Sequence, residues 1–195
     1  PLQDGGGLAG LVIGEQRRYA DLQREVITDP LTRVRNRSAL RRRLDAAARV
    51  GGDGRDGDGD SELTVAVFDL DDFKPINDTY GHDIGDVVLQ VVAERISSHV
   101  RGDDLVVRLG GDEFAVVFAV GTAREDVESS VRRIVGAVTE PIVVDGLRLS
   151  VGVSAGQATG PAVEVMHRLD QLLRGLDNTM GAGGQQVVRL VIAPG

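Results

Sequence analysis

The strongest constraint on the fold lies at residues 108–114, Arg-Leu-Gly-Gly-Asp-Glu-Phe, where two β-rich runs meet in a glycine pair. Apolar and β-branched residues flank Gly110 and Gly111 on both sides, which predicts two antiparallel strands joined by a tight hairpin. Glycine has no Cβ, so the backbone at this tip can approach a ligand closely. Asp112 and Glu113 follow the glycines, and two adjacent acids at a hairpin tip favour a site that holds a divalent metal against phosphate.

A second acidic segment follows another β-rich run. Residues 64–70, Thr-Val-Ala-Val-Phe-Asp-Leu, contain few polar residues and predict a buried strand. The run carries Asp69 near its end, and Asp71 and Asp72 follow directly. Carboxylates at the end of a buried strand, beside an acidic hairpin, are the arrangement of a two-metal phosphoryl-transfer site. Mg²⁺ prefers oxygen ligands and keeps waters, so one or two carboxylates plus substrate phosphates are sufficient.

With further motifs, these segments resemble the GGDEF domain family, the diguanylate cyclases, from about residue 29 to about residue 154. The matches occur in family order: Asp29-Pro-Leu-Thr32, Asn36-Arg37, Phe68-Asp-Leu-Asp-Asp-Phe-Lys74, Asn77-Asp78, Gly81-His82, Gly85-Asp86 and Arg108-x-Gly-Gly-Asp-Glu-Phe114. The resemblance implies an α/β (α+β) fold like that of nucleotidyl cyclases and polymerase palms, with a mixed, largely antiparallel sheet flanked by helices.

The resemblance also implies roles for the acids. Asp69, the backbone carbonyl of Leu70 and Asp112 would hold Mg²⁺ (or Mn²⁺), with two ions in each half-site. Glu113 would be a further metal ligand or the partner of the attacking hydroxyl, and both alternatives stay open. Lys74 would reach the substrate phosphates and offset their charge as pyrophosphate leaves. The expected catalytic residues are therefore Asp112, Glu113 and Lys74.

The expected substrate is GTP, read by Asn77 and Asp86, which resemble the family's guanine-reading pair. A carboxylate accepts hydrogen bonds from guanine N1–H and N2–H₂, and an amide offers both a donor and an acceptor. Adenine cannot satisfy that carboxylate, so the pair favours guanine. The remaining residues expected to line the GTP pocket are Phe73, His82, Gly110 and Gly111.

Arg101 and Asp104 lie just upstream of the hairpin, at the offset of the family's inhibitory product site. There an arginine contacts guanine O6 and N7 in bidentate fashion, and the aspartate takes the donor edge; the alternative is a surface pair before a strand. The implied reaction joins two GTP molecules into cyclic di-GMP with loss of pyrophosphate. One domain holds only half of that reaction, so the resemblance implies a homodimer.

Two departures from the family pattern keep a second hypothesis open. The segment 176–186 keeps Asp177 but lacks the usual tyrosine, lysine and arginine, and Arg33 stands where glycine is usual. One hypothesis is an active, Mg²⁺-dependent diguanylate cyclase with product inhibition. The other is a catalytically weak or inactive module that binds GTP or cyclic di-GMP as a regulatory domain. A polynucleotide polymerase is disfavoured, because the acidic chain has no extension for fingers or a thumb.

Composition agrees with a nucleotide enzyme rather than a nucleic-acid binder. The net charge is −8, and duplex binding depends on cationic neutralisation of phosphates. There are no cysteines, which excludes disulfides and thiolate metal sites. No apolar run approaches the ~20 residues that span a bilayer, and no secretory signal is present. We therefore expect a cytoplasmic fragment without nucleic-acid or direct membrane contact.

We expect two regions: an N-terminal extension at 1–28, ending a truncated upstream region, and a GGDEF domain at 29–195. Within the first, Val12, Tyr19 and Val26 lie seven apart, which is typical of a signalling helix that pairs two protomers; the alternative is a helix packed on its own domain. The patterns predict helices at 38–50, 83–100, 123–138 and 162–178, strands at 64–70, 104–109, 114–120 and 186–192, and a hairpin at 142–154 turning at Asp145-Gly146.

Overall fold

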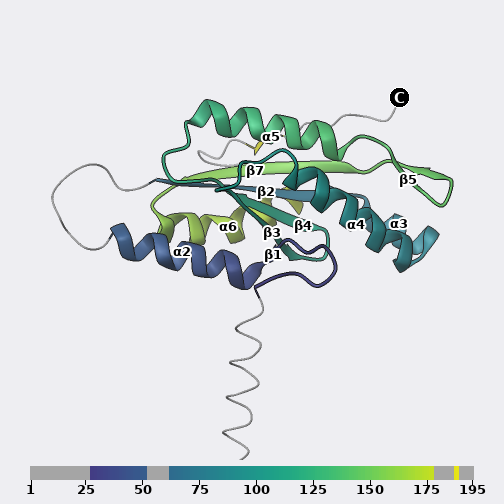
Figure 1. Cartoon of the computed structure of the whole chain (residues 1–195), viewed down its shortest axis with the longest axis horizontal. Coiled ribbons are helices and arrows are strands. Elements are labelled where there is room, and N and C mark those ends of the chain that lie inside the picture. The colour runs from purple at the N-terminus through teal and green to yellow at the C-terminus, as the bar shows by residue number, and fades with distance from the viewer. Residues whose placement is uncertain (1–26, 52–61, 178–186, 189–195) are drawn as a thin grey trace, which may run out of the picture.

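The computed structural model describes residues 27–51, 62–177 and 187–188 (Figure 1). The elements in chain order are β1 (Arg35–Asn36), α2 (Arg37–Gly51), β2 (Leu63–Asp71), α3 (Phe73–Tyr80), α4 (His82–Ser97), β3 (Leu105–Gly110), β4 (Glu113–Val117), α5 (Arg124–Val138), β5 (Ile142–Val144), β6 (Leu147–Leu149), β7 (Gly152–Gly160), α6 (Ala162–Asp177) and β8 (Val187–Val188).

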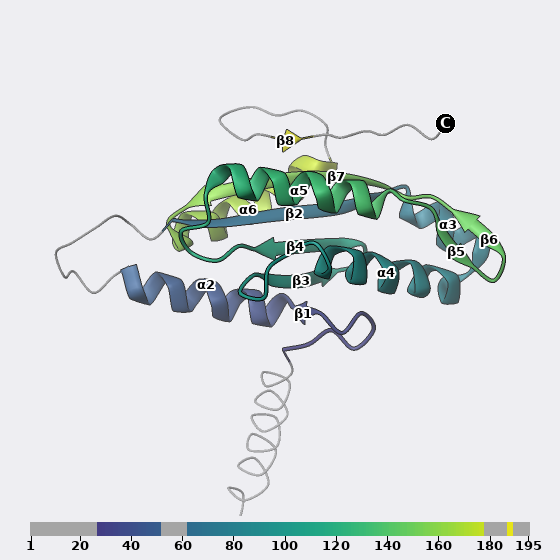
Figure 2. The ribbon, with the colours of Figure 1, turned by 45° about the horizontal axis from the view of Figure 1, so that its top comes forward.

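A six-stranded sheet forms the centre of the molecule, with the strand order β1-β3-β4-β2-β7-β8 (Figure 2). β1 runs parallel to β3, and every other neighbouring pair in this sheet is antiparallel. The expected mixed, largely antiparallel sheet flanked by helices is confirmed. The long strand β2 has β4 on one side and β7 on the other, so the end that carries Asp69 is held in register from both sides.

Alternation along β2 sorts its side chains onto two cores. Ala66, Phe68 and Leu70 pack in a cluster with residues of α3, α4 and α5, whereas Val65 and Val67 pack with residues of α2 and α6. Neighbouring residues of a strand point to opposite faces, so one strand supplies both layers. The odd-numbered positions that continue past Val67 are Asp69 and Asp71, at the strand end.

The helix expected at 83–100 is shorter, and a separate helix precedes it. The structure has α3 at Phe73–Tyr80 and then α4 at His82–Ser97, with Gly81 between them at a φ of 86°. The sequence of α3 is rich in Asn, Asp and Thr, which are poor helix formers, and it contains Pro75. Proline is tolerated there because the first turn of a helix has no backbone partner for its N–H.

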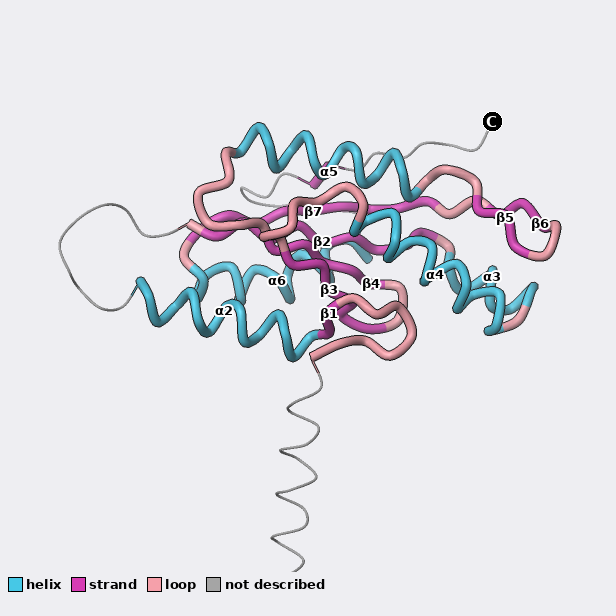
Figure 3. Tube along the Cα trace, in the orientation of Figure 1, coloured by secondary structure: helices cyan, strands magenta, loops and turns pink. Residues whose placement is uncertain are grey.

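The hairpin expected at 142–154 is confirmed around its turn but is shorter than expected. β5 and β6 do pair around Asp145 and Gly146, whose φ angles of 49° and 79° are both positive, as in a type I′ turn. The hairpin projects from the same end of the molecule as α3 (Figure 3). It ends at Leu149, however, and Gly152–Gly160 forms β7, a long strand of the central sheet. β7 is largely buried, but its small residues do not form the apolar pattern that predicts a buried strand.

Candidate functional site

The predicted acids of β2 and β4 are brought together by strand register. Asp69 lies directly opposite Glu113 on β4 and opposite Ser154 on β7. Facing residues in an antiparallel pair have Cβ atoms about 4.5–5.5 Å apart and share one face of the sheet. The backbone N–H of Leu70 donates to the carbonyl of Asp112 over 3.4 Å, which ties the hairpin tip to the end of β2.

The hairpin turns at Gly111 and Asp112, one residue later than the glycine pair suggests. Gly110 is paired with Glu113, and a register shift separates it from Arg108. Gly110 has a φ of 154° and Gly111 a φ of 51°. A positive φ at the first central position is typical of type II′ hairpin turns and favours glycine there. The turn therefore presents Asp112 at the tip and returns Glu113 to the strand.

Asp71 and Asp72 have local structural roles. The Ser154 hydroxyl donates to Asp71 Oδ1 over 2.7 Å. A Cβ at Gly152 would lie 2.8 Å from Asp71 Oδ2, so the Asp71 carboxylate occupies the space that a side chain there would need. Asp72 precedes α3 with a φ of 55°, and its side chain makes no capping hydrogen bond. The left-handed residue turns the chain from the strand end into α3.

The two predicted guanine-reading residues lie on α3 and α4, which pack against each other. A Cβ on Gly85 would lie only 1.9 Å from Asn77 Oδ1, so the Asn77 amide packs directly on the helix backbone at Gly85. Asp86 is the next residue and is exposed. Lys74, in the first turn of α3, is also exposed. The structure thus places one amide, one carboxylate and one ammonium beyond the acidic end of β2.

Phe73 and His82, two of the four other residues predicted to line this pocket, differ in exposure. Phe73 is only 7% exposed and packs in the core cluster that includes Ile76 and Leu89. The Phe73 side chain anchors α3 to the core and offers little surface to a nucleotide. His82 begins α4 and is exposed.

The two residues of the predicted product site, Arg101 and Asp104, make different kinds of contact. Asp104 accepts backbone hydrogen bonds from the N–H of Arg101 and the N–H of Ala119, each over 2.9 Å. The Arg101 guanidinium donates to Asp126 on α5 over 3.1 Å, and both side chains are more than half exposed. Asp104 therefore shapes the loop before β3, while Arg101 lies at the surface.

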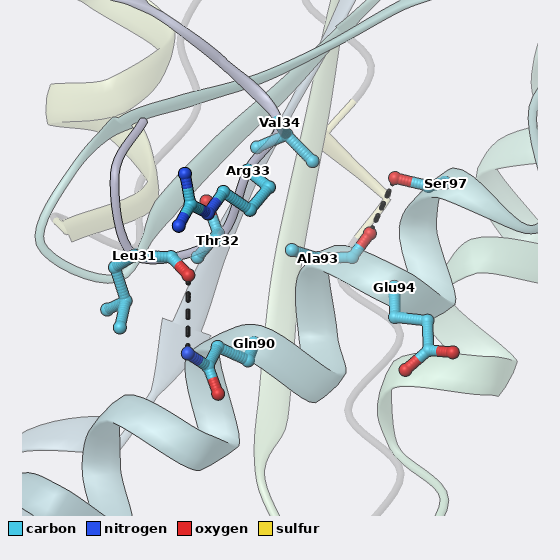
Figure 4. Close-up of a pocket in the computed structure, with 8 residues that line it drawn as sticks. All are labelled: Leu31, Thr32, Arg33, Val34, Gln90, Ala93, Glu94 and Ser97. Atoms are coloured by element: carbon cyan, nitrogen blue, oxygen red, sulfur yellow. Dashed lines mark hydrogen bonds between the residues drawn. The ribbon is translucent and has the colours of Figure 1, made fainter. Parts of the chain in front are cut away.

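A cavity of about 480 Å³ lies away from these residues, between α4 and residues 31–34 (Figure 4). Gln90 crosses it to donate to the Leu31 carbonyl over 3.3 Å. Arg33 and Glu94 also line the cavity. None of the predicted site residues lines it, so we do not identify it with the nucleotide site.

Sequence reasoning gave no role to two motif residues that form a mostly buried ion pair. Arg108 Nη1 lies 3.1 Å from Asp29 Oδ1, and the two side chains are 13% and 17% exposed. Burial raises the pKa of Asp29, but hydrogen bonds from Thr32 and from Arg108 outweigh it and leave the pKa below its ordinary value. Their separation by 79 positions explains why no local pattern revealed the pair. Arg33 in the same turn has a φ of 64°, a conformation that favours glycine.

The acids at the end of β2 and at the hairpin tip offer only part of the ligand set of a divalent metal. Among the residues that the structure describes, no group of three or more Asp, Glu or His side chains is arranged to hold a metal ion. A complete protein cage is not what Mg²⁺ requires, because it usually keeps waters and binds one or two carboxylates plus substrate phosphates. The paired Asp69 and Glu113, with Asp112 joined to Leu70, offer such a partial set of oxygen ligands.

Comparison with known proteins identifies the family. A family model described as "Diguanylate cyclase, GGDEF domain" matches residues 26–186. The chain belongs to the GGDEF family. Diguanylate cyclase DgcP of Pseudomonas aeruginosa is 37% identical over 159 residues, which covers 78% of this chain and 23% of DgcP. The chain spans about a quarter to a third of the length of the first curated relatives that it matches.

Solved structures agree with this GGDEF assignment. The coiled coil and GGDEF domain of DgcB from Caulobacter crescentus, in complex with c-di-GMP, has a TM-score of 0.68 and 27% identity, covering 88% of this chain and 91% of that one. The GGDEF domain of TpbB from Pseudomonas aeruginosa has a TM-score of 0.68 and 33% identity, covering 78% and 90%. In the part of this GGDEF chain that the structure describes, none of the helices has the length and apolar character needed to cross a membrane.

Proposed function

We propose that this GGDEF domain is one half of a cytoplasmic diguanylate cyclase that converts two GTP molecules into cyclic di-GMP. The observation that carries the proposal is the meeting of Asp69, Glu113 and the Asp112 backbone at one end of the sheet. This end leads directly into α3 and α4, which carry Asn77 and Asp86. The family and the cyclase relatives support the same activity.

Each residue has a role that its chemistry supports. Asn77 and Asp86 bind the guanine edge, and Lys74 lies against the triphosphate as a point charge. Asp69, the Leu70 carbonyl and Asp112 would hold Mg²⁺ or Mn²⁺, which would neutralise phosphate charge and favour ionisation of the attacking hydroxyl.

In the proposed reaction, the 3′-oxygen of one GTP attacks the α-phosphorus of the other. A bond forms from that oxygen to phosphorus, and the bond from phosphorus to the bridging oxygen of pyrophosphate breaks. The hydroxyl proton passes to the Glu113 carboxylate, because Asp112 would hold the metal. In the second step the 3′-oxygen of the other nucleotide attacks the α-phosphorus of the first, a second pyrophosphate leaves, and the ring closes. Two domains must therefore face each other, and the helix expected at residues 11–28 would pair them. Residues 1–26 lie outside the described residues.

Product control is a further part of the proposal. Cyclic di-GMP would bind at Arg101, whose guanidinium suits guanine O6 and N7. Asp104 would act there by holding the loop, since its carboxylate already accepts backbone hydrogen bonds from Arg101 and Ala119.

A second candidate function is a non-catalytic module that binds GTP or cyclic di-GMP. It is favoured by the sequence of residues 176–186, which lacks the family's usual tyrosine, lysine and arginine. Residues 178–186 lie outside the described residues.

Incubation of the protein with GTP and Mg²⁺, followed by chromatography of the nucleotides, tests the two functions. Asp112→Asn, checked for an unchanged thermal transition, is the control. The cyclase proposal expects cyclic di-GMP from the wild type and none from the variant. GTP binding by a dimeric sample without any cyclic dinucleotide would instead support the binding module.

A further inference from the structure

The tip of the signature hairpin (residues 108–114) is built from residues with little conformational restriction. Gly110 and Gly111 adopt φ angles of 154° and 51°, and glycine reaches many such conformations at similar energy. The position of Asp112 therefore depends on contacts that hold its main chain from outside the turn. One such contact is the hydrogen bond from the Leu70 N–H to the Asp112 carbonyl over 3.4 Å.

A second contact holds the peptide group on the other side of Asp112. The Gly111 carbonyl accepts from Arg108 Nε over 3.0 Å and from Nη2 over 2.7 Å. The peptide bond is planar and none in the described residues is cis, so fixing this carbonyl also fixes the Asp112 N–H, which points the opposite way. Both peptide groups that flank Asp112 are thus anchored, one on β2 and the other on a single arginine.

The same guanidinium connects the hairpin to the Asp29 turn (residues 29–34). Arg108 Nη1 donates to Asp29 Oδ1 over 3.1 Å. Asp29 Oδ1 also accepts from the Thr32 N–H over 2.8 Å and from the Thr32 hydroxyl over 2.6 Å. The backbone N–H of Asp29 donates to the Val34 carbonyl over 2.8 Å, which closes the turn. The chain then enters β1, which pairs with β3 at Arg108 itself.

We propose that Arg108 is a positioning residue for the cyclase reaction: it sets the peptide that precedes Asp112, and the Asp29 turn sets Arg108. The inference rests on the proposed function for its catalytic readout. It makes one side chain the link between the turn at the start of the domain and the acidic tip. A change in the Asp29 turn reaches Asp112 through this guanidinium.

The kinetic test compares Arg108→Gln, Arg108→Lys and Asp29→Asn with a matched control. Arg168→Gln is that control, because Arg168 also bridges a backbone carbonyl (Thr159, 3.0 Å) and a carboxylate (Glu164, 3.1 Å), but on β7 and α6. A displacement of about 1 Å at a reacting group costs about 100-fold in rate. Arg108→Gln should therefore lower kcat by about 100-fold at saturating Mg²⁺, with KM for GTP within about twofold of wild type.

The two other variants separate charge from shape. Arg108→Lys keeps the charge for Asp29 but lacks the planar fork that holds the Gly111 carbonyl, so it should not restore kcat. Asp29→Asn keeps the fork on that carbonyl and should lower kcat less than Arg108→Gln does. Arg168→Gln should leave kcat and KM unchanged. A folded Arg108→Gln variant with wild-type kcat, or with its defect confined to KM, would overturn the proposal.

Amide hydrogen exchange of residues 108–114 provides a readout that needs no activity. Loss of the anchor should speed exchange at the tip at least tenfold in Arg108→Gln, and Arg168→Gln should leave it unchanged. If the wild-type protein makes no cyclic dinucleotide, the proposed function fails while faster tip exchange still supports the anchor. If exchange at the tip is unchanged in folded Arg108→Gln and Arg108→Lys, the positioning role fails even in an active enzyme.

Discussion

Replacement of Gly85 by alanine should weaken GTP binding while changing the stability of the domain little. Gly85 is buried in α4, and a Cβ there would lie 1.9 Å from Asn77 Oδ1 and 3.0 Å from Asn77 Cγ. The amide oxygen must move by about 1.5 Å to reach an ordinary van der Waals separation of 3.4 Å from the new methyl group. Asn77 has a short side chain that can rotate, so we expect the amide, rather than the helix, to yield.

Two effects of opposite sign set the change in the free energy of unfolding of Gly85→Ala. Alanine in place of glycine stabilises a helix interior by roughly 0.8–1.0 kcal/mol, and displacing the Asn77 amide costs a comparable amount, so the free energy of unfolding should stay within about 1 kcal/mol of wild type. Loss of one hydrogen bond to guanine costs roughly 0.5–1.5 kcal/mol, which is about a 2- to 12-fold rise in the dissociation constant for GTP.

Denaturant unfolding and calorimetric titration with GTP measure these quantities in a double-mutant cycle. In an Asn77→Ala background the clash with the amide is absent, and the nearest remaining contact of the new Cβ is Phe73 Cζ at 3.3 Å. Gly85→Ala should there recover most of its helix gain of about 1 kcal/mol. Gly136→Ala in α5 is the matched control, because nothing lies within 4 Å of a Cβ at that position. Non-additive stability changes would show that the Asn77 amide has moved, and unchanged GTP affinity in Gly85→Ala would then refute the placement of Asn77 in the guanine pocket.

Five further variants have expected outcomes. Asp29→Asn should lower the free energy of unfolding by about 1–3 kcal/mol at neutral pH. Hydrogen bonding lowers the pKa of Asp29 in the folded state. The stabilisation by the Asp29 carboxylate is therefore present above its ordinary pKa and should vanish as pH falls through the lowered value. Urea titrations at pH 7 and at pH 2 to 4 would measure this loss. Asp104→Ala should lower the free energy of unfolding by about 1–3 kcal/mol, because it removes the acceptor of two backbone N–H groups. Arg101→Ala should leave thermal stability unchanged and relieve product inhibition. Equal melting temperatures for the two variants would contradict this division of roles. Asp112→Asn should abolish turnover with an unchanged melting temperature, and retained turnover would exclude it as a metal ligand. Asp86→Ala should reduce the preference for GTP over ATP in competition binding, and unchanged selectivity would place the base elsewhere.

The sequence predicted those parts of the molecule that depend on local patterns. The apolar runs around Asp69 and around the glycine pair predicted both strands of the acidic end, because a buried strand needs a continuous apolar or β-branched run. β7 was missed because, apart from Val153, its buried positions are filled by glycine, alanine and serine, which carry no strand pattern. Helix α3 was missed because its stability comes from burial of Phe73 and Ile76 rather than from helix propensity.

The contacts that position the site were less accessible to sequence reasoning. Asp29 and Arg108 were recognised as motif residues, yet only the β1–β3 pairing brings them within ion-pair distance. The crowding of Asn77 against Gly85 likewise depends on the angle between two helices. Such contacts arise from the packing of whole elements, so no periodicity along the chain records them.

A crystal structure of the protein with a non-hydrolysable GTP analogue and Mn²⁺ would test the central claim most directly. The account predicts an anomalous peak at about 2.0–2.2 Å from carboxylate oxygens of Asp69 and Asp112, with the guanine edge against Asn77 and Asp86. An ordered analogue whose metal lies outside these carboxylates, or Asp69 and Asp112 carboxyl groups held well over ~10 Å apart and too distant to share the ion, would contradict it.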